Sequence, residues 1–77
     1  MNKKSEYYWE ECNENVIEIS PSGKVYRNHK CYGRWKPGYY LNNAQTWRDF
    51  EHVQKITYRQ AILWLTLDYE SPLHVTT

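Results

Sequence analysis

Cys12, His29, Cys31 and His52 carry the side chains in this chain that could hold a metal ion. Thiolate and imidazole groups are the usual ligands of zinc, and structural zinc sites combine two pairs of ligands, each pair close together in the chain. Only His29 and Cys31 form such a pair, because Cys12 and His52 each lie far from a second ligand. We therefore expect no metal site, and we expect no other cofactor.

A cysteine beside a histidine could also act as a nucleophile, but the sequence places neither thiol at a helix N-terminus, where such groups are activated. Serine-hydrolase, metalloprotease and phosphate-loop motifs are absent as well. The four clustered carboxylates are expected to form a solvated face rather than an acid and base pair. They are Glu10, Glu11, Glu14 and Glu18. We predict that the protein is not an enzyme.

Both cysteines are expected to be buried or half-buried free thiols, with a disulfide between them as the alternative. A disulfide would need an oxidising compartment, and the first residues, MNKKSEYYWEE, contain no apolar run of the signal-peptide type. No stretch is long and apolar enough to span a membrane. The expected location is the cytoplasm, either of a cell or of an infected host cell.

Charge is segregated along the chain, although the net charge is only +1. Residues 5–23 contain five glutamates and no cation, whereas residues 24–48 contain six cations and no acid. Such a cationic stretch can be the electrostatic footprint of a binding surface. The competing interpretation is that the acidic and basic stretches lie side by side in a sheet and neutralise one another by cross-strand pairing.

The segment KCYGRWKPGYY, residues 30–40, combines four aromatic rings with three cations. Tyr, Trp and Arg are enriched in the cores of protein interfaces, where rings anchor and cations steer toward an acidic surface. We therefore expect a protein partner to be bound by this segment, with the protein serving as an adaptor or an inhibitor. The predicted contact residues are Tyr32, Arg34, Trp35, Lys36 and Tyr39.

The alternative function is binding of single-stranded nucleic acid or RNA by the same segment, because cations along a groove and stacking rings are what such recognition needs. Four further residues would join the contact in that case. They are Lys24, Tyr26, Arg27 and Lys30. No zinc-finger, recognition-helix or ribonucleoprotein motif accompanies them.

Strand signals dominate the first 28 residues. The stretch YYWEEC reads as one strand, and the runs Val16–Ile19 and Lys24–Asn28 read as two more around the turn SPSG. Pro21 and Gly23 suit a type I turn followed by a left-handed residue, which places Ile19 opposite Val25. A fourth short strand is possible at Tyr39–Leu41.

Two helices are expected in the second half. A short helix or 3₁₀ turn would begin with Thr46 as its N-cap, and a longer one would begin at Thr57, which forms a capping box with Gln60. Leu63, Leu65, Leu67 and Tyr69 also alternate, so a strand at Leu63–Tyr69 is the alternative. On the helix, a second apolar patch could be a homodimer interface or a second contact surface. It consists of Leu63, Trp64 and Leu67.

These signals predict one α+β domain over residues 1–77, in which a small antiparallel β-sheet is covered by the C-terminal helix. The sheet would be a three-stranded meander, with the fourth strand possible. Residues 1–5 and 71–77 are expected to be loose termini. The expected core is Trp9, Ile17, Ile19, Val25, Phe50, Ile62 and Leu65.

Overall fold

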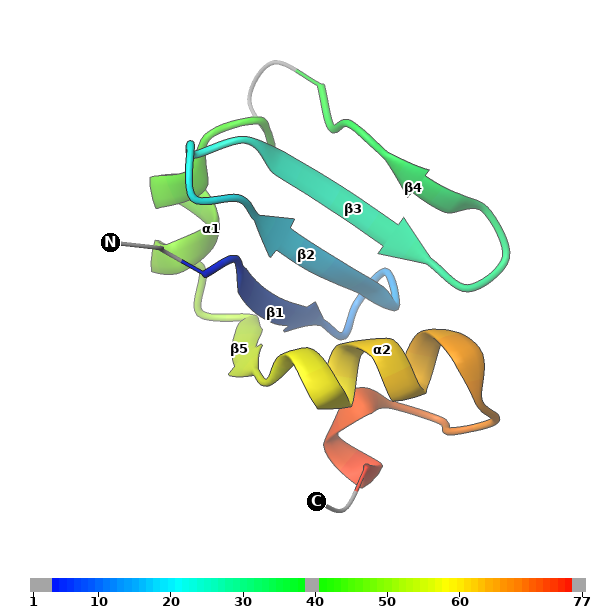
Figure 1. Ribbon diagram of the computed structural model, residues 1–77. Coiled ribbons are helices and arrows are strands. Elements are labelled where there is room, and N and C mark those ends of the chain that lie inside the picture. Colours follow the sequence, from blue (N-terminus) through cyan, green and yellow to red (C-terminus); the bar gives the residue numbers. More distant parts are fainter. Residues whose placement is uncertain (1–3, 39–40, 76–77) are drawn as a thin grey trace.

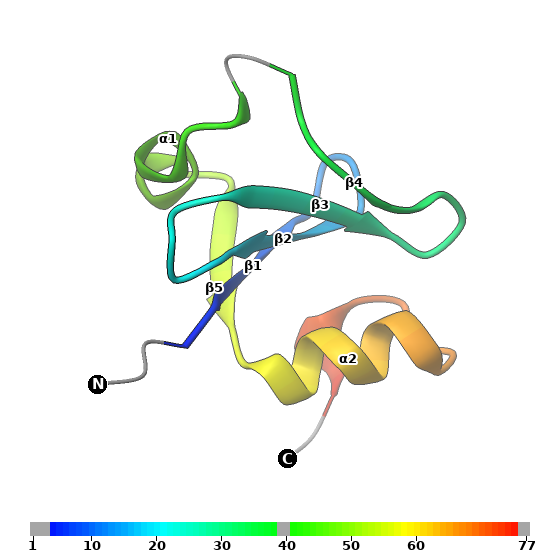
Figure 2. The same ribbon diagram turned by 45° about the horizontal axis from the view of Figure 1, so that its top comes forward.

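The computed structural model describes residues 4–38 and 41–75 and confirms the α+β class. One antiparallel sheet has the strand order β4-β3-β2-β1-β5, with α1 on one face and α2 on the other (Figures 1 and 2). The strands are β1 (Glu6–Glu10), β2 (Asn15–Ile19), β3 (Val25–His29), β4 (Gly33–Trp35) and β5 (Val53–Ile56). The helices are α1 (Ala44–Asp49), α2 (Tyr58–Thr66) and the 3₁₀ helix η2 (Pro72–His74).

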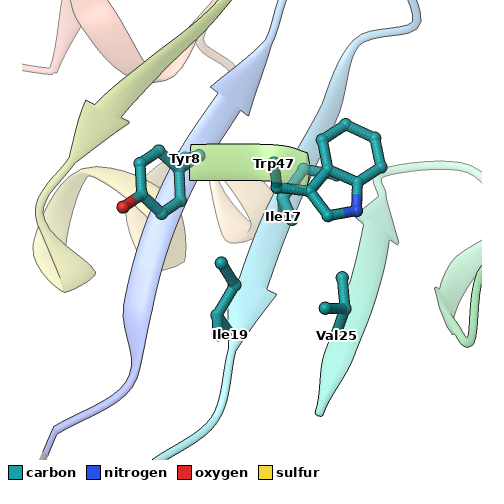
Figure 3. Close-up of a cluster of buried hydrophobic side chains, with 5 residues drawn as sticks. All are labelled: Tyr8, Ile17, Ile19, Val25 and Trp47. Carbon is teal, nitrogen blue, oxygen red and sulfur yellow. The ribbon is translucent and has the colours of Figure 1, made fainter. Parts of the chain in front are cut away.

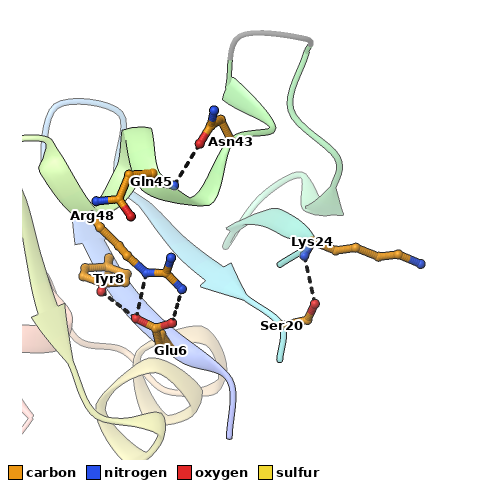
Figure 4. Close-up of polar contacts among 7 residues, drawn as sticks. All are labelled: Glu6, Tyr8, Ser20, Lys24, Asn43, Gln45 and Arg48. Carbon is orange, nitrogen blue, oxygen red and sulfur yellow. Dashed lines mark hydrogen bonds and ion pairs between the residues drawn. The ribbon is translucent and has the colours of Figure 1, made fainter. Parts of the chain in front are cut away.

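The meander β1-β2-β3 forms as the sequence predicts. Ile19 lies opposite Val25, and the turn between them is closed by Gly23, whose N–H donates to the carbonyl oxygen of Ser20 over 2.9 Å. Gly23 has φ of 89°, the left-handed conformation that favours glycine. The Ser20 hydroxyl also accepts the N–H of Lys24, which tightens the turn (Figure 4).

The sheet has five strands rather than three or four. The fourth strand is β4, at residues 33–35. Of the predicted strand Tyr39–Leu41, residues 39–40 lie outside the described residues, and the N–H of Leu41 donates to the carbonyl oxygen of Gly38. The fifth strand, β5, pairs with the free edge of β1. Sequence analysis missed β5 because its two apolar residues, Val53 and Ile56, are three positions apart, a spacing that does not show the alternation of a strand.

Strands β4 and β5 lie at opposite edges of the sheet, so the segment that connects them must cross one of its faces. That segment contains α1. After β5 the chain turns back along the other face as α2, and Figure 2 shows the sheet between the two helices. Both faces of a short sheet are thereby covered, which allows its central strands to be apolar on both sides.

On the α1 face, Trp47 is fully buried against Ile17, Ile19 and Val25, with Tyr8 beside them (Figure 3). The indole N–H of Trp47 donates to the carbonyl oxygen of Leu41, so the ring is buried without leaving its polar group unpaired. This side chain is the fully buried contact of α1 with the three central strands.

On the α2 face, Trp64 packs edge-on against Trp9 with ring centroids 4.9 Å apart. Val16, Ile56 and Ala61 complete this second buried cluster. Ile56 and Ala61 flank the N-terminus of α2 and pack in the same cluster, at the positions of a hydrophobic staple. Each face of the sheet therefore has its own core, centred on tryptophan.

The helix ends follow side-chain capping. The capping box of α2 is present, because Thr57 Oγ1 accepts the N–H of Gln60 over 3.1 Å and Gln60 Oε1 accepts the N–H of Thr57 over 2.9 Å. The strand alternative for residues 63–69 is wrong, since α2 continues to Thr66. Helix α1 begins two residues before the predicted N-cap. Asn43 takes that role, because its side chain accepts the N–H of Gln45 (Figure 4) and also that of Thr46.

The predicted core is right for the sheet and partly wrong for the helices. Trp9, Ile17, Ile19 and Val25 are buried, and Leu65 is half-buried against the second cluster. Phe50 and Ile62 are 42% and 37% exposed. Phe50 follows the last residue of α1 and touches Trp47 only with its ring edge, and Ile62 lies one residue after Ala61, whose side chain faces the sheet.

The described part of the C-terminal segment, residues 71–75, is packed rather than loose. Ser71 caps η2 by accepting the N–H of Leu73, and both Pro72 and Val75 are buried. Within residues 4–38 and 41–75, no helix is long and apolar enough to cross a membrane.

Trp47→Ala should destabilise the protein by about 3–5 kcal/mol, because it empties the centre of the α1 face. Phe50→Ala removes a neighbouring ring that is 42% exposed, and it should cost no more than about 1 kcal/mol. Urea unfolding of both variants, followed by circular dichroism, measures the difference. Equal losses would contradict the assignment of Trp47 as the anchor of this face.

Candidate functional site

Three ion pairs join the acidic stretch to the basic stretch and decide how much of the cationic segment is available. Glu10 pairs with Arg27 over 2.8 Å, Glu18 pairs with Arg34 over 3.3 Å, and Glu6 pairs with Arg48. Three of the six cations in residues 24–48 are thus neutralised by three of the five glutamates in residues 5–23. The intramolecular interpretation of the charge pattern holds for the arginines.

Two of these pairs join residues on strands that are separated by one strand of the sheet. Glu10 on β1 and Arg27 on β3 meet across β2, and Glu18 on β2 and Arg34 on β4 meet across β3, one pair on each face of the sheet. In each pair the arginine and glutamate side chains together bridge about 10 Å, twice the spacing of neighbouring strands. Arg34 crosses over the ring of Tyr26, with its guanidinium carbon 3.9 Å from the ring centroid. A cation held over a ring in this way is positioned as well as paired.

The pair on the α1 face is buried. The side chains of Glu10 and Arg27 are each only 10% exposed, Asn15 donates to the same carboxylate oxygen, and Trp35 lies 4.6 Å from the guanidinium carbon of Arg27. Within the described residues, Asn15 Oδ1 and Arg27 Nε are buried without a hydrogen-bond partner. Arg27 therefore serves the core rather than an outside ligand, which removes it from the predicted nucleic-acid contacts.

The third pair involves Glu6, whose carboxylate accepts hydrogen bonds from Arg48 and from the Tyr8 hydroxyl (Figure 4). These bonds, with that from Arg48 the strongest, hold the pKa of the Glu6 carboxyl below its ordinary value of 4.5. Burial and the neighbouring Glu6 raise the pKa of Tyr8. The contact ties α1 to the first residue of β1.

Lys30 binds carbonyl groups at the C-terminal end of α2. Its ammonium group donates to the carbonyl oxygens of Leu67 and Tyr69 over 2.7 and 3.0 Å, and it lies 5.2 Å from the ring centroid of Trp64. Cations stabilise helix C-termini because they satisfy the last carbonyl groups. The ammonium group of Lys30, which the sequence suggests as a phosphate contact, is therefore already bound within the domain.

The remaining predicted nucleic-acid residues do not gather on one surface. Lys24 is exposed in the turn before β3, whereas Lys30 follows the far end of that strand. Tyr26 is half-buried under Arg34 on the α2 face, and Arg27 is buried on the α1 face. The structure thus separates the four side chains that a strand of phosphates would have to contact together.

The predicted protein-contact residues do lie together, on residues 31–36, which we call the β4 arm. Tyr32 at its turn is 81% exposed, Trp35 is 39% exposed, the side chain of Arg34 is 53% exposed, and Lys36 is exposed. Lys36 makes no ion pair with any residue that the structure describes. Tyr39, the fifth predicted contact, lies outside the described residues.

The arm is held in place by its own contacts. The ring of Tyr32 lies 4.7 Å from that of His29, and His29 Nδ1 accepts the N–H of Cys31 over 3.0 Å. Gly33 has φ of 77°, which turns the chain into β4, and Trp35 rests under Arg27. Each exposed ring therefore has a neighbouring side chain in the domain that supports its position.

The predicted patch on α2 is not an exposed surface. Trp64 is 3% exposed and Leu63 is half-buried, and of the three predicted side chains only Leu67, at 51%, is largely accessible. Trp64 faces the sheet rather than solvent. The sequence alone does not reveal which apolar stripe of the helix meets the sheet. The exposed apolar side chains of α2 are Tyr58 and Ile62, which border a shallow hollow of about 360 Å³ that Arg34 lines from the other side.

Cys12 and Cys31 are free thiols, as expected, but both are exposed rather than buried. Each lies in a turn that joins neighbouring strands, one between β1 and β2 and the other between β3 and β4, where side chains point to solvent. Across the described residues, no group of three or more His, Cys, Asp and Glu side chains is placed to hold a metal ion.

Comparison of the chain with known protein families, with curated proteins and with solved structures gave no match. The functional argument therefore depends on the residues of this chain alone.

Glu10→Gln should destabilise the protein by about 3 kcal/mol, because it leaves the buried Arg27 charge without its partner. Glu10→Gln combined with Arg27→Met should recover most of that loss. As a matched control, Glu18→Gln breaks the more exposed pair with Arg34 and should cost less than about 1 kcal/mol. Urea unfolding measures all three, and equal effects of the two single variants would contradict the distinction.

The lowered pKa of Glu6 predicts a loss of stability in acid. A carboxyl whose folded pKa lies below its unfolded value of 4.5 stabilises the fold above that pH, and the contribution disappears as the pH falls through the folded pKa. Arg48→Met should therefore lower the melting temperature at neutral pH and reduce its further fall in acid. Arg59→Met removes an exposed cation elsewhere and should leave the pH profile unchanged; a matching profile for Arg48→Met would refute the prediction.

Proposed function

We propose that this protein is a non-catalytic interaction module that binds a larger protein through its β4 arm and acts as an adaptor or an inhibitor by occupying a surface of that protein. The observation that carries the proposal is the display of Tyr32 and Trp35, two rings 81% and 39% exposed, beside the cation Lys36. Tyr, Trp and Arg are the residues that contribute most often to the energetic centres of protein interfaces.

The support given to these rings strengthens the proposal. Tyr32 lies against His29, and Trp35 lies under Arg27, so neither ring has to be ordered when a partner binds. Fixing a side chain on binding costs about 0.5–1.5 kcal/mol, and a ring that is already fixed avoids that cost. Exposed aromatic surface that is rigid is what a contact site needs.

Charge favours a protein partner over a nucleic acid. Phosphate binding gains its free energy from cations that release counterions, and Arg27, Arg34 and Arg48 are each paired with a glutamate. The accessible charge left on the arm is small, enough to orient an acidic protein surface. Nucleic-acid binding is therefore the alternative that the experiment must test.

A photoreactive benzophenone side chain at position 32 should crosslink to one protein from the source cell or its host. The same side chain at position 50, another exposed ring position, serves as the matched control and should give no such product. Excess unlabelled protein should compete for the product, whereas the Trp35→Ala protein should compete at least about tenfold less well. The same products from both positions would contradict the proposal.

Binding of the same protein to oligonucleotides tests the nucleic-acid alternative. Retention on single-stranded and duplex oligonucleotides is measured at ~50 and ~200 mM salt, between which a true phosphate binder loses orders of magnitude in affinity. We expect no retention at either salt. Salt-sensitive retention that Arg34→Gln weakens would overturn the protein-binding proposal in favour of nucleic acid.

A further inference from the structure

Strand β4 ends the sheet, and its outer edge carries backbone groups that no other strand among the described residues pairs. All three of its residues are exposed, and in Figure 1 the strand forms the open border of the sheet beside β3. An unpaired edge is a template for one more strand unless the protein blocks it. The edge therefore offers a partner main-chain hydrogen bonds in addition to the exposed rings.

The opposite edge of the sheet is built differently. β5 presents Gln54 and Lys55 as its exposed residues, and its last residue, Ile56, is buried under α2. A lysine without an exposed ring is typical of an edge protected against pairing. β4 instead combines a cation with an exposed tryptophan, and the exposed Tyr32 lies in the turn before it. Of the two edge strands, β4 is the one that itself contains an exposed aromatic ring.

The alternation of side chains along β4 specifies what an added strand would carry. Arg34 points to the α2 face, toward Glu18, and Trp35 points to the α1 face, under Arg27. Gly33 lies on the same side as Trp35, and a Cβ atom added there would meet nothing within 4 Å. An apolar side chain opposite this position would fill the open space beside the Trp35 ring, as aromatic residues do over edge glycines.

The positive charge of Arg34 favours an acidic residue at the middle position of the added strand, between the two apolar residues. The side chain of Arg34 is 53% exposed and meets Glu18 at 3.3 Å through one nitrogen, Nη2, so its other guanidinium nitrogens can donate to a second carboxylate. Directly opposite residues of an added strand have Cβ atoms about 4.5–5.5 Å apart, close enough for an ion pair. An acidic side chain opposite Arg34 would also lie near Lys36, which has no acidic partner among the described residues.

We propose that β4 binds an extended segment of a protein partner as a sixth strand, and that this segment reads apolar–acidic–apolar opposite Trp35, Arg34 and Gly33. Main-chain hydrogen bonds would supply affinity and the three side-chain positions would supply specificity, as in other cases of strand addition. This inference rests on the proposed function, whose contact surface it makes specific.

Short random peptides displayed on phage and selected on the intact protein provide the probe. The selected sequences should share the apolar–acidic–apolar pattern, and nuclear magnetic resonance should show contacts between peptide Hα atoms and residues 33–35. Methylating one of two neighbouring backbone nitrogens of such a peptide should weaken binding about tenfold, because that nitrogen donates to β4, whereas methylating the other should have little effect.

Two variants with the same change of charge provide the matched control. Arg34→Gln should weaken the selected peptides by about tenfold, whereas Arg59→Gln, on the exposed surface of α2, should not. Glu18→Gln should strengthen binding by a few fold, because it removes the carboxylate that competes for Arg34.

Peptides that contact another surface, peptides insensitive to N-methylation at every position, or a failure to select any peptide would each overturn strand addition. The proposed function fails separately, when the crosslinker at position 32 yields no protein. If crosslinking at position 32 depends on Trp35 but the selected peptides do not contact β4, the interaction module is supported and the sixth strand is rejected. Peptides docked on β4 would support the sixth strand even if no cellular protein were crosslinked.

Discussion

The structure depends on one constraint, that a sheet with two apolar faces must be covered on both by a chain of 77 residues. Two short segments meet this demand, and each is secured by a tryptophan: Trp47 on one face and Trp64, against Trp9, on the other. A large ring buries more apolar surface than any other side chain, so a helix of six or nine residues is sufficient to cover each face. The segment with α1 connects β4 and β5, which lie at opposite edges of the sheet, across one face, and α2 follows β5 along the other.

Charged side chains are likewise used for contacts within this small domain. Arg27 on β3 and Arg34 on β4 extend across neighbouring strands to reach glutamates, and Lys30 joins the turn before β4 to the end of α2. These contacts stiffen the region from which the β4 arm projects. Charges that looked like a binding footprint in the sequence are largely used to assemble the domain, and what remains on the arm is a set of exposed rings with few free cations.

Sequence reasoning succeeded where the signal is local. The β2-β3 turn and the capping box of α2 follow from residues a few positions apart, and both formed as predicted. It failed where a distant segment decided the outcome. β5 becomes a strand because β1 offers a free edge, and Phe50 loses its place in the core because Trp47 fills the space above β2. The candidate contact residues are near neighbours in the chain, but their exposure could not be read from it.

The sequence by itself determined the α+β class, the meander, the ends of α2 and the segregation of acidic and basic stretches, because turn chemistry, capping and alternation act between near neighbours. Only the tertiary structure decided which charges are neutralised and which rings remain exposed. Ion pairs and burial depend on which strands lie next to one another and on which helix face meets the sheet, and these relations join residues such as Glu10 and Arg27 or Glu6 and Arg48 that the chain keeps far apart. The β4 arm is exposed for the same reason, since its strand is the last of the sheet.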